Sequence, residues 1–186
     1  MAIYQYNINL IPRQSIIEKC GFIPETLPID NEAWSKHWNS KSLEADYDFE
    51  DALNYPWWSK RKTDFKSIEP FIDSYTKPIE WSKHYAGIKT YGDNDTNDMS
   101  IDIADDGCIE NFSCRLDLRK FDDIFITNIL KIAKQLDCLL MDRKGNLFEP
   151  YGEALWESIQ QSNSYKFVDN PTDFLEKLSS GQIKPE

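Results

Sequence analysis

Apolar and polar residues alternate in three stretches of the chain, as they do in strands that bury one face. The first stretch is Ala2 to Ile11, and Pro12 ends it. The other two, residues 99–104 and 108–118, are separated by Asp105-Asp106-Gly107, which has the composition of a tight turn. The sequence therefore predicts an antiparallel hairpin with one polar face. A strand over residues 85–91 would extend this hairpin to three strands.

Apolar side chains at three- and four-residue spacing indicate several helices. The clearest is residues 121–136, and we expect its apolar stripe to pack on the apolar face of the hairpin. That stripe consists of Phe121, Ile124, Phe125, Ile129, Ile132, Ala133 and Leu136. Further helices are expected over 13–20, 64–75, 153–161 and from Asn170-Pro171 onward, with short aromatic-packed helices within 22–62 and two more strands at 138–141 and 147–149.

Strands and helices occur in runs, without regular alternation, which is typical of α+β proteins. We expect a mainly antiparallel sheet of about five to six strands with helices packed on it. The 186 residues fit a single domain, with an aromatic-rich helical first part (about 13–82) and a sheet and helix core (about 85–180). The predicted core contains Phe112, Cys114, Leu116, Phe125, Ile129, Ile132, Leu139 and Leu140.

The chain is acidic, with 32 Asp and Glu against 21 Lys and Arg and a formal net charge of -11. This charge disfavours nucleic acid and anionic membranes as partners and favours a basic protein. No run approaches the roughly 20 apolar residues of a membrane span. The amino terminus also lacks the basic and then apolar pattern of a targeting segment. We therefore expect a cytoplasmic protein, in which the four cysteines are unpaired apolar side chains.

Motifs for cofactors and catalysis are missing from the sequence. The seven glycines are scattered singly, so no loop has the pattern that cradles a phosphate, and we expect no nucleotide cofactor. Neither His37 nor His84 adjoins a nucleophile motif. We expect no catalytic residue and no bound metal.

One acidic run stands out, and it consists of Asp93, Asp95, Asp98, Asp102, Asp105, Asp106 and Glu110. Residues 93–123 hold ten acidic and three basic side chains, and so carry seven of the eleven net negative charges. A calcium loop beginning at Asp93 is excluded, because Asp98 stands where glycine is needed and Ala104 where glutamate is needed. The run could instead supply a metal-dependent hydrolase, attract a cationic partner, or only keep the protein soluble.

Six tryptophans are many for this length, and five of them precede residue 85. Burial in the core is the usual role of such rings. Trp57 and Trp58, which follow Pro56, would instead anchor a protein partner if they were exposed.

The carboxyl-terminal half carries a resemblance. The segment IDIADDGCIENFSCRLDL, the amphipathic helix after it and the run LDCLLMDRKGNLFEP resemble the small immunity proteins that accompany bacterial polymorphic toxins. They are similar also to uncharacterised small bacterial proteins. The likeness covers about residues 97–178 and includes no catalytic or binding motif, so it transfers no functional residue. It implies a non-enzymatic inhibitor that binds and blocks a toxin, often a basic nuclease.

These observations predict a non-catalytic protein-binding module, an immunity-like inhibitor that binds a basic toxin or effector domain through an acidic surface. The alternatives are a metal-dependent hydrolase that uses the carboxylates of residues 93–110, and a structural or regulatory subunit. The residues expected to contact the partner are the seven of the acidic run together with Trp57 and Trp58.

Overall fold

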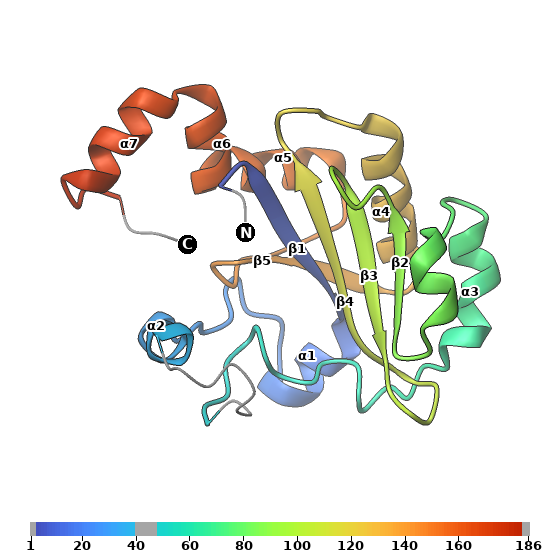
Figure 1. The fold of residues 1–186 in the computed structure, drawn as a ribbon. Helices are drawn as coiled ribbons and strands as arrows, with labels where there is room; N and C mark the ends of the chain where they lie inside the picture. Colours follow the sequence, from blue (N-terminus) through green and yellow to red (C-terminus); the bar gives the residue numbers. More distant parts are fainter. Residues whose placement is uncertain (1–2, 40–47, 184–186) are drawn as a thin grey trace.

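A β-sheet forms the centre of the fold. The structure is a computed structural model, and it describes residues 3–39 and 48–183. Six strands, each antiparallel to its neighbours, lie in the order β2-β3-β4-β1-β5-β6 (Figure 1). The fold is therefore α+β with a mainly antiparallel sheet, as predicted. The strands are β1 (Gln5–Pro12), β2 (Ile88–Gly92), β3 (Asp98–Ile103), β4 (Ile109–Asp117), β5 (Cys138–Asp142) and β6 (Leu147–Phe148).

The helices largely match the predicted segments. They are α1 (Arg13–Cys20), α2 (Asn31–Asn39), α3 (Phe65–Asp73), the 3-10 helix η1 (Glu80–His84), α4 (Asp123–Gln135), α5 (Gly152–Gln161), α6 (Asn163–Asp169) and α7 (Pro171–Ser179). Helix α3 continues through Pro70. Helix α6 was not predicted. One residue, Ser162, separates it from α5, and the Ser162 side chain accepts a hydrogen bond from the backbone N–H of Tyr165.

The aromatic-rich region 22–62 contains less helix than predicted. In its described part, α2 is the one α-helix, and residues 40–47 of the expected helices lie outside the described residues. Pro24, Pro28 and Pro56, together with the hydrogen-bonded turns of 48–62, explain this difference. Trp57, for example, donates its indole N–H to the carbonyl oxygen of Ala52 at 2.8 Å, within its own turn-rich segment.

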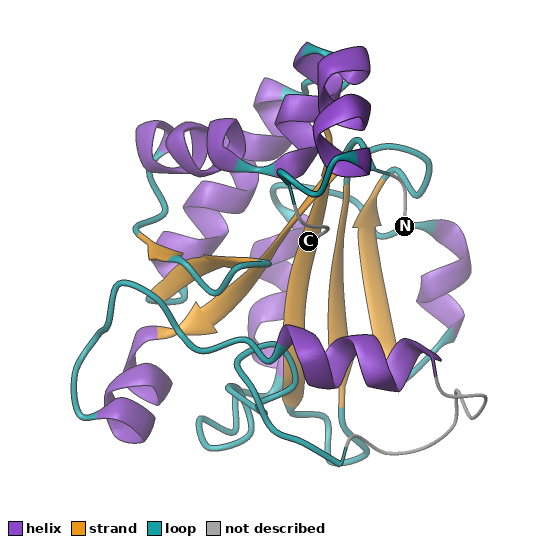
Figure 2. Ribbon diagram, turned by 90° about the vertical axis from the view of Figure 1, so that its left-hand side faces the viewer, coloured by secondary structure: helices purple, strands orange, loops and turns teal. Residues whose placement is uncertain are grey.

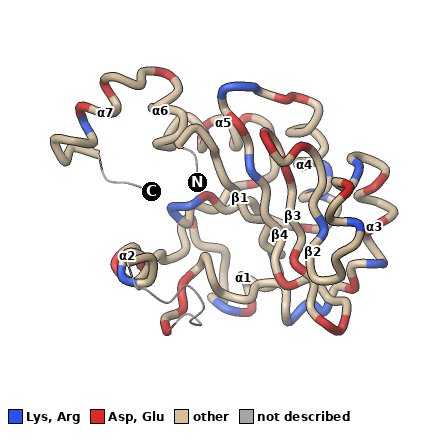
Figure 3. Tube along the Cα trace, in the orientation of Figure 1, with Lys and Arg blue, Asp and Glu red and all other residues tan. Residues whose placement is uncertain are grey.

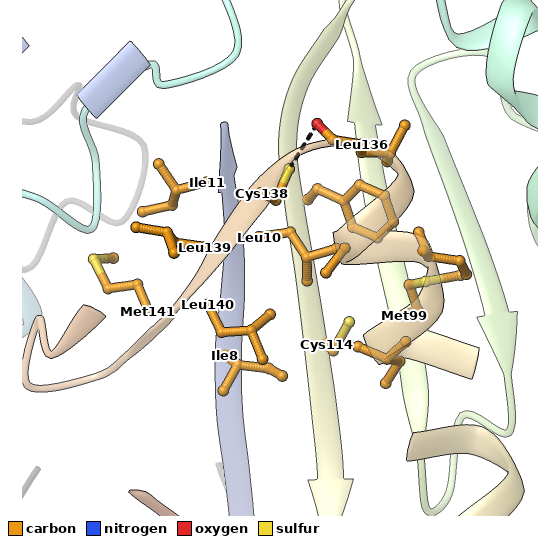
Figure 4. Packing of buried hydrophobic residues seen from close by; sticks show 14 of the residues in the cluster. Ile8, Leu10, Ile11, Met99, Cys114, Leu136, Cys138, Leu139, Leu140 and Met141 are labelled. Carbon is orange, nitrogen blue, oxygen red and sulfur yellow. Dashed lines mark hydrogen bonds between the residues drawn. The ribbon is translucent and has the colours of Figure 1, made fainter. Parts of the chain in front are cut away.

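Helix α4 covers the apolar face of the sheet. It connects β4 to β5, which lie on either side of β1, so the helix crosses over that strand. All eight residues predicted to form the core belong to one buried cluster, which confirms that prediction. Figure 4 shows Ile8, Leu10, Met99, Cys114 and Leu140 gathered on the side of Leu136, while Ile11, Leu139 and Met141 lie on the other side of their strands.

The opposite face of the sheet is polar over four strands. Thr90, Ser100, Ser113 and Asn9 are aligned in register across β2, β3, β4 and β1. Side chains of a strand alternate between faces, so this row lies opposite the apolar side chains under α4. In Figure 2, α2 lies in front of one end of the strands, and other helices lie at the opposite end of the strands. The wet face predicted for the hairpin is confirmed.

Candidate binding surface

The acidic run is divided between the two ends of the β3 and β4 hairpin (Figure 3). Asp93 and Asp95 lie in the turn between β2 and β3, where β4 also leads into α4; we call this the α4 end. We call the opposite end, at the turn between β3 and β4, the turn end. It carries Asp102, Asp105, Asp106 and Glu110. The six residues of β3 span roughly 17 Å at about 3.4 Å per residue. The acidic run therefore forms two groups of carboxylates about one strand length apart, because successive turns of a meander lie at opposite ends of its strands.

Asp98 is not available to a partner. Its side chain is 10% exposed and forms an ion pair with Arg115, the residue directly across from it on β4. Burial raises the pKa of the Asp98 carboxyl, and the neighbouring Arg115 guanidinium acts in the opposite direction. Arg115 also donates a hydrogen bond to the carbonyl oxygen of Asn94. Asp98 therefore fastens the β2–β3 turn, which contradicts its assignment to the partner surface.

Trp57 and Trp58 are buried, with 7% and 1% of their surface exposed. The Trp58 indole N–H donates to the carbonyl oxygen of Leu10 at 2.9 Å, and its ring packs beside that of Phe112. The expectation of an exposed anchor at this pair is wrong, and the alternative of a core role is confirmed. The tryptophans that are exposed are Trp38, Trp81 and Trp156.

A groove of about 590 Å³ lies at the α4 end. Its walls are the residues after α3, the β2–β3 turn and the first turn of α4. Three exposed carboxylates line it, from Asp93, Asp122 and Asp123, against one exposed cation, Lys120. The groove is therefore acidic, and its volume lies in the range that ligand-binding sites occupy.

Two apolar side chains in the groove are open to solvent. Phe121 is 45% exposed and Ile124 is 75% exposed. The Phe121 ring meets the edge of Trp156 on α5, with 5.5 Å between ring centroids, and Trp156 is itself 40% exposed. Apolar surface thus continues from the groove onto α5. Exposed apolar patches with polar surroundings are typical of protein-binding sites.

The exposure of Phe121 and Ile124 corrects the predicted α4 stripe. Asp122 caps the helix through a hydrogen bond from the backbone N–H of Phe125 to its Oδ1 at 2.9 Å, so Phe121 precedes the helix. Ile126 takes the buried position that was expected for Ile124, because it lies three residues before the fully buried Ile129. The sequence did contain a signal, since an aspartate at this position is a common helix start.

Side-chain amides hold the groove walls in place. The buried Asn97 accepts a hydrogen bond from the backbone N–H of Asp117 at 2.9 Å and donates one to the carbonyl oxygen of Lys120. On the other wall, Asn128 of α4 donates to the carbonyl oxygen of Tyr75 at 2.8 Å. These bonds connect β2–β3, α3 and α4. A site fixed in this way loses less conformational entropy when it binds.

Gly92 allows the β2–β3 turn to approach α4. Its φ of +93° is favourable only for glycine, and a Cβ there would lie 2.5 Å from the carbonyl oxygen of Asn97 and 2.8 Å from a ring carbon of Phe125. The close approach sets the depth of the groove.

At the same end of the sheet, Asp117, the last residue of β4, is neutralised by Arg119. The Asp117 side chain is 1% exposed and accepts two hydrogen bonds from the guanidinium, at 3.0 and 2.6 Å. These bonds hold the pKa of the Asp117 carboxyl below its ordinary value, and burial opposes them. Arg119 in turn lies 3.3 Å above the ring of Tyr4. The negative charge offered to a partner at this end therefore comes from the exposed carboxylates of the groove.

The described part of the chain has no group of three or more His, Cys, Asp and Glu side chains that could hold a metal ion. The carboxylates of residues 93–110 are divided between the two ends of the sheet. The cysteines are all unpaired, and Cys114 and Cys138 are buried.

Comparisons with protein-family models, with curated proteins and with solved structures found no match for this chain. Among the residues that the structure describes, none of the helices has the length and apolar character needed to cross a membrane.

Proposed function

We propose that this chain is a non-catalytic protein-binding module, an immunity-like inhibitor that binds a basic toxin or effector domain in the cytoplasm. The observation that carries the proposal is the combination, at the α4 end, of a preformed groove, exposed apolar side chains and exposed carboxylates. Apolar contacts that exclude water supply affinity, and complementary charge supplies a fast and selective encounter.

The charge distribution supports a cationic partner. Exposed carboxylates occur at both ends of the hairpin, within a chain whose net charge is -11. A field of one sign raises the local concentration of oppositely charged molecules and their association rate. The sequence resemblance to immunity proteins, whose targets are often basic nucleases, points to the same class of partner.

The two alternatives have less support. For a metal-dependent hydrolase the carboxylates are the correct ligand type, but their separation between two ends of the sheet removes the reason for grouping them. Calorimetric titration with calcium, magnesium and manganese tests this alternative, and a dissociation constant in the low micromolar range would favour it. A structural or regulatory subunit would use the same kind of surface and would differ only in its partner.

The direct test is co-expression with a basic protein domain encoded by a neighbouring gene, followed by measurement of association kinetics. We expect the chain to relieve the toxicity of that domain and to bind it. Reversing four exposed carboxylates to lysine (Asp95, Asp105, Glu110 and Asp123) should slow association by about tenfold or more at low salt, and by less as salt shortens the screening length to roughly 8 Å and below.

A matched control separates a binding surface from net charge alone. It reverses four other exposed carboxylates, Glu18, Glu25, Asp169 and Glu176, which lie outside the hairpin, the groove and α5. We expect a much smaller effect from this control. Equal slowing by both variants would leave the acidic run as a solubility feature, and absence of binding by the wild-type chain would contradict the proposed function.

A further inference from the structure

We infer that the groove at the α4 end binds a basic amphipathic helix of the partner. This inference rests on the proposed function and adds to it the surface that is used and the shape of the segment that enters it. The groove combines exposed apolar side chains, Phe121 and Ile124, with carboxylates on two different walls, Asp93 of the β2–β3 turn and Asp123 of α4. A segment that fits must therefore carry an apolar stripe with cations on both sides of it.

An added β-strand is the other common way for a peptide to bind, and the sheet edges disfavour it. The outer edge of β2 is bridged by residues 77–79, where the Ile79 N–H donates to the carbonyl oxygen of Thr90 at 2.7 Å. The outer edge of β6 is bridged by residues 25–27, where the Leu147 N–H donates to the carbonyl oxygen of Glu25 at 2.8 Å. Strand addition needs unpaired backbone groups. A helix needs none, because its own backbone groups are paired internally.

The carboxylates of the groove retain acceptor capacity for cations. Asp93 and Asp122 each use Oδ1 to accept one backbone N–H of their own turn, from Asp95 and Phe125 respectively. A carboxylate offers about four acceptor positions, so each keeps its second oxygen for a ligand. Asp95 and Asp123 are exposed at the same end. Lysine or arginine on either side of the apolar stripe of an incoming helix would face these groups, while the apolar side chains, at i and i+3 or i+4 spacing, enter between them.

The two kinds of contact should govern different rate constants. Apolar side chains that the partner covers exclude water and set the dissociation rate, whereas exposed charges act at longer range and set the association rate. The amide bonds of Asn97 and Asn128 keep the walls in place before binding. We therefore expect binding without rearrangement of the β2–β3 turn.

The test is titration of the full ¹⁵N-labelled chain with a synthetic 15-residue helical peptide that has leucine at i, i+3, i+4 and i+7 spacing and lysine elsewhere. A twin peptide with glutamate in place of lysine is the ligand control. We expect the basic peptide to bind and to shift the indole N–H resonance of Trp156, which lies against Phe121. The acidic twin should not bind.

Three variants locate the site. Ile124→Ser should weaken peptide binding by about tenfold, and the 75% exposure of Ile124 means that the fold does not depend on it. Asp95→Lys with Asp123→Lys should weaken binding by about tenfold at low salt and by less at high salt. Asp105→Lys with Glu110→Lys, the same charge change at the turn end, should change the affinity by less than about threefold.

Two results would overturn the inference: no binding of the basic peptide at millimolar concentration, or equal weakening by the turn-end and α4-end variants. Both leave the proposed function open to its own test. If Ile124→Ser leaves the affinity for a basic protein partner unchanged, the proposed function stands and the assignment of this site is wrong. If the chain binds the peptide but binds no basic protein domain, the site is supported and the proposed function is wrong.

Discussion

The two ends of the β3–β4 hairpin carry similar charge, but they differ in shape and in exposed apolar surface. At the turn end, Asp105 and Asp106 occupy a tight turn whose large side chains are all acidic. Asp106 accepts the backbone N–H of Cys108 at 3.0 Å, which holds the pKa of the Asp106 carboxyl below its ordinary value. At the α4 end, the carboxylates surround a groove that also exposes Phe121 and Ile124.

The difference follows from what converges at each end. The β3–β4 turn is a local structure that packs along residues 63–65, where the Phe65 N–H donates to the carbonyl oxygen of Gly107 and the Ile109 N–H to that of Thr63. The α4 end is the junction of a turn, the end of α3 and the beginning of α4, and such junctions leave concave space. Acidic charge by itself therefore does not define a binding surface, and the surrounding shape and apolar area do.

The largest effect that tests this comparison concerns helix α4. Ile129→Ala removes a side chain that is 1% exposed and should lower the free energy of unfolding by about 2 to 5 kcal/mol. Ile124→Ala on the same helix should change it by less than about 0.5 kcal/mol, because Ile124 is 75% exposed. Urea denaturation measures both. A large loss for Ile124→Ala would mean that this residue supports the fold and is not a free contact surface.

A smaller effect should come from the amide that fixes the groove. Asn97→Ala leaves the buried N–H of Asp117 without its acceptor, and we expect a loss of about 1 to 3 kcal/mol in the free energy of unfolding. Asp106→Ala also removes a hydrogen bond to a backbone N–H, but at an exposed position of the turn end, so its loss should be smaller. Denaturation of both variants decides whether the α4 end is the more rigid of the two. Equal losses would remove the argument for a preformed groove.

The smallest effect concerns acid stability. The folded pKa of Asp117 lies below the unfolded value of about 3.9, so its ion pair with Arg119 stabilises the fold above that value. This contribution is lost as the pH falls through the folded pKa. Asp117→Asn should therefore be less stable than the wild type at neutral pH, and the difference should shrink as the pH falls through the folded pKa. Thermal melts between pH 2 and 7 measure this, and a constant difference over that range would contradict it.

Much of the fold was already determined by the sequence itself. The alternation in β1, β3 and β4 and the apolar stripe in the later turns of α4 are local patterns, and the residues that they identified belong to one buried cluster. Gly21 directly follows the helix predicted over 13–20, where a glycine commonly takes the left-handed conformation that ends a helix, and its φ is +80°. Such features could be predicted because side-chain burial along a strand or helix follows directly from its period of two or 3.6 residues.

Only the tertiary structure decided which of these features lie together. It divided one acidic run between two ends of the sheet, buried Trp57 and Trp58, and brought residues 75, 93 and 124 around one groove. None of these outcomes depends on a local period. They depend on contacts between segments that are distant in sequence, such as Asn128 with the end of α3 and Trp58 with β1, and a pattern along the chain contains no information about those contacts.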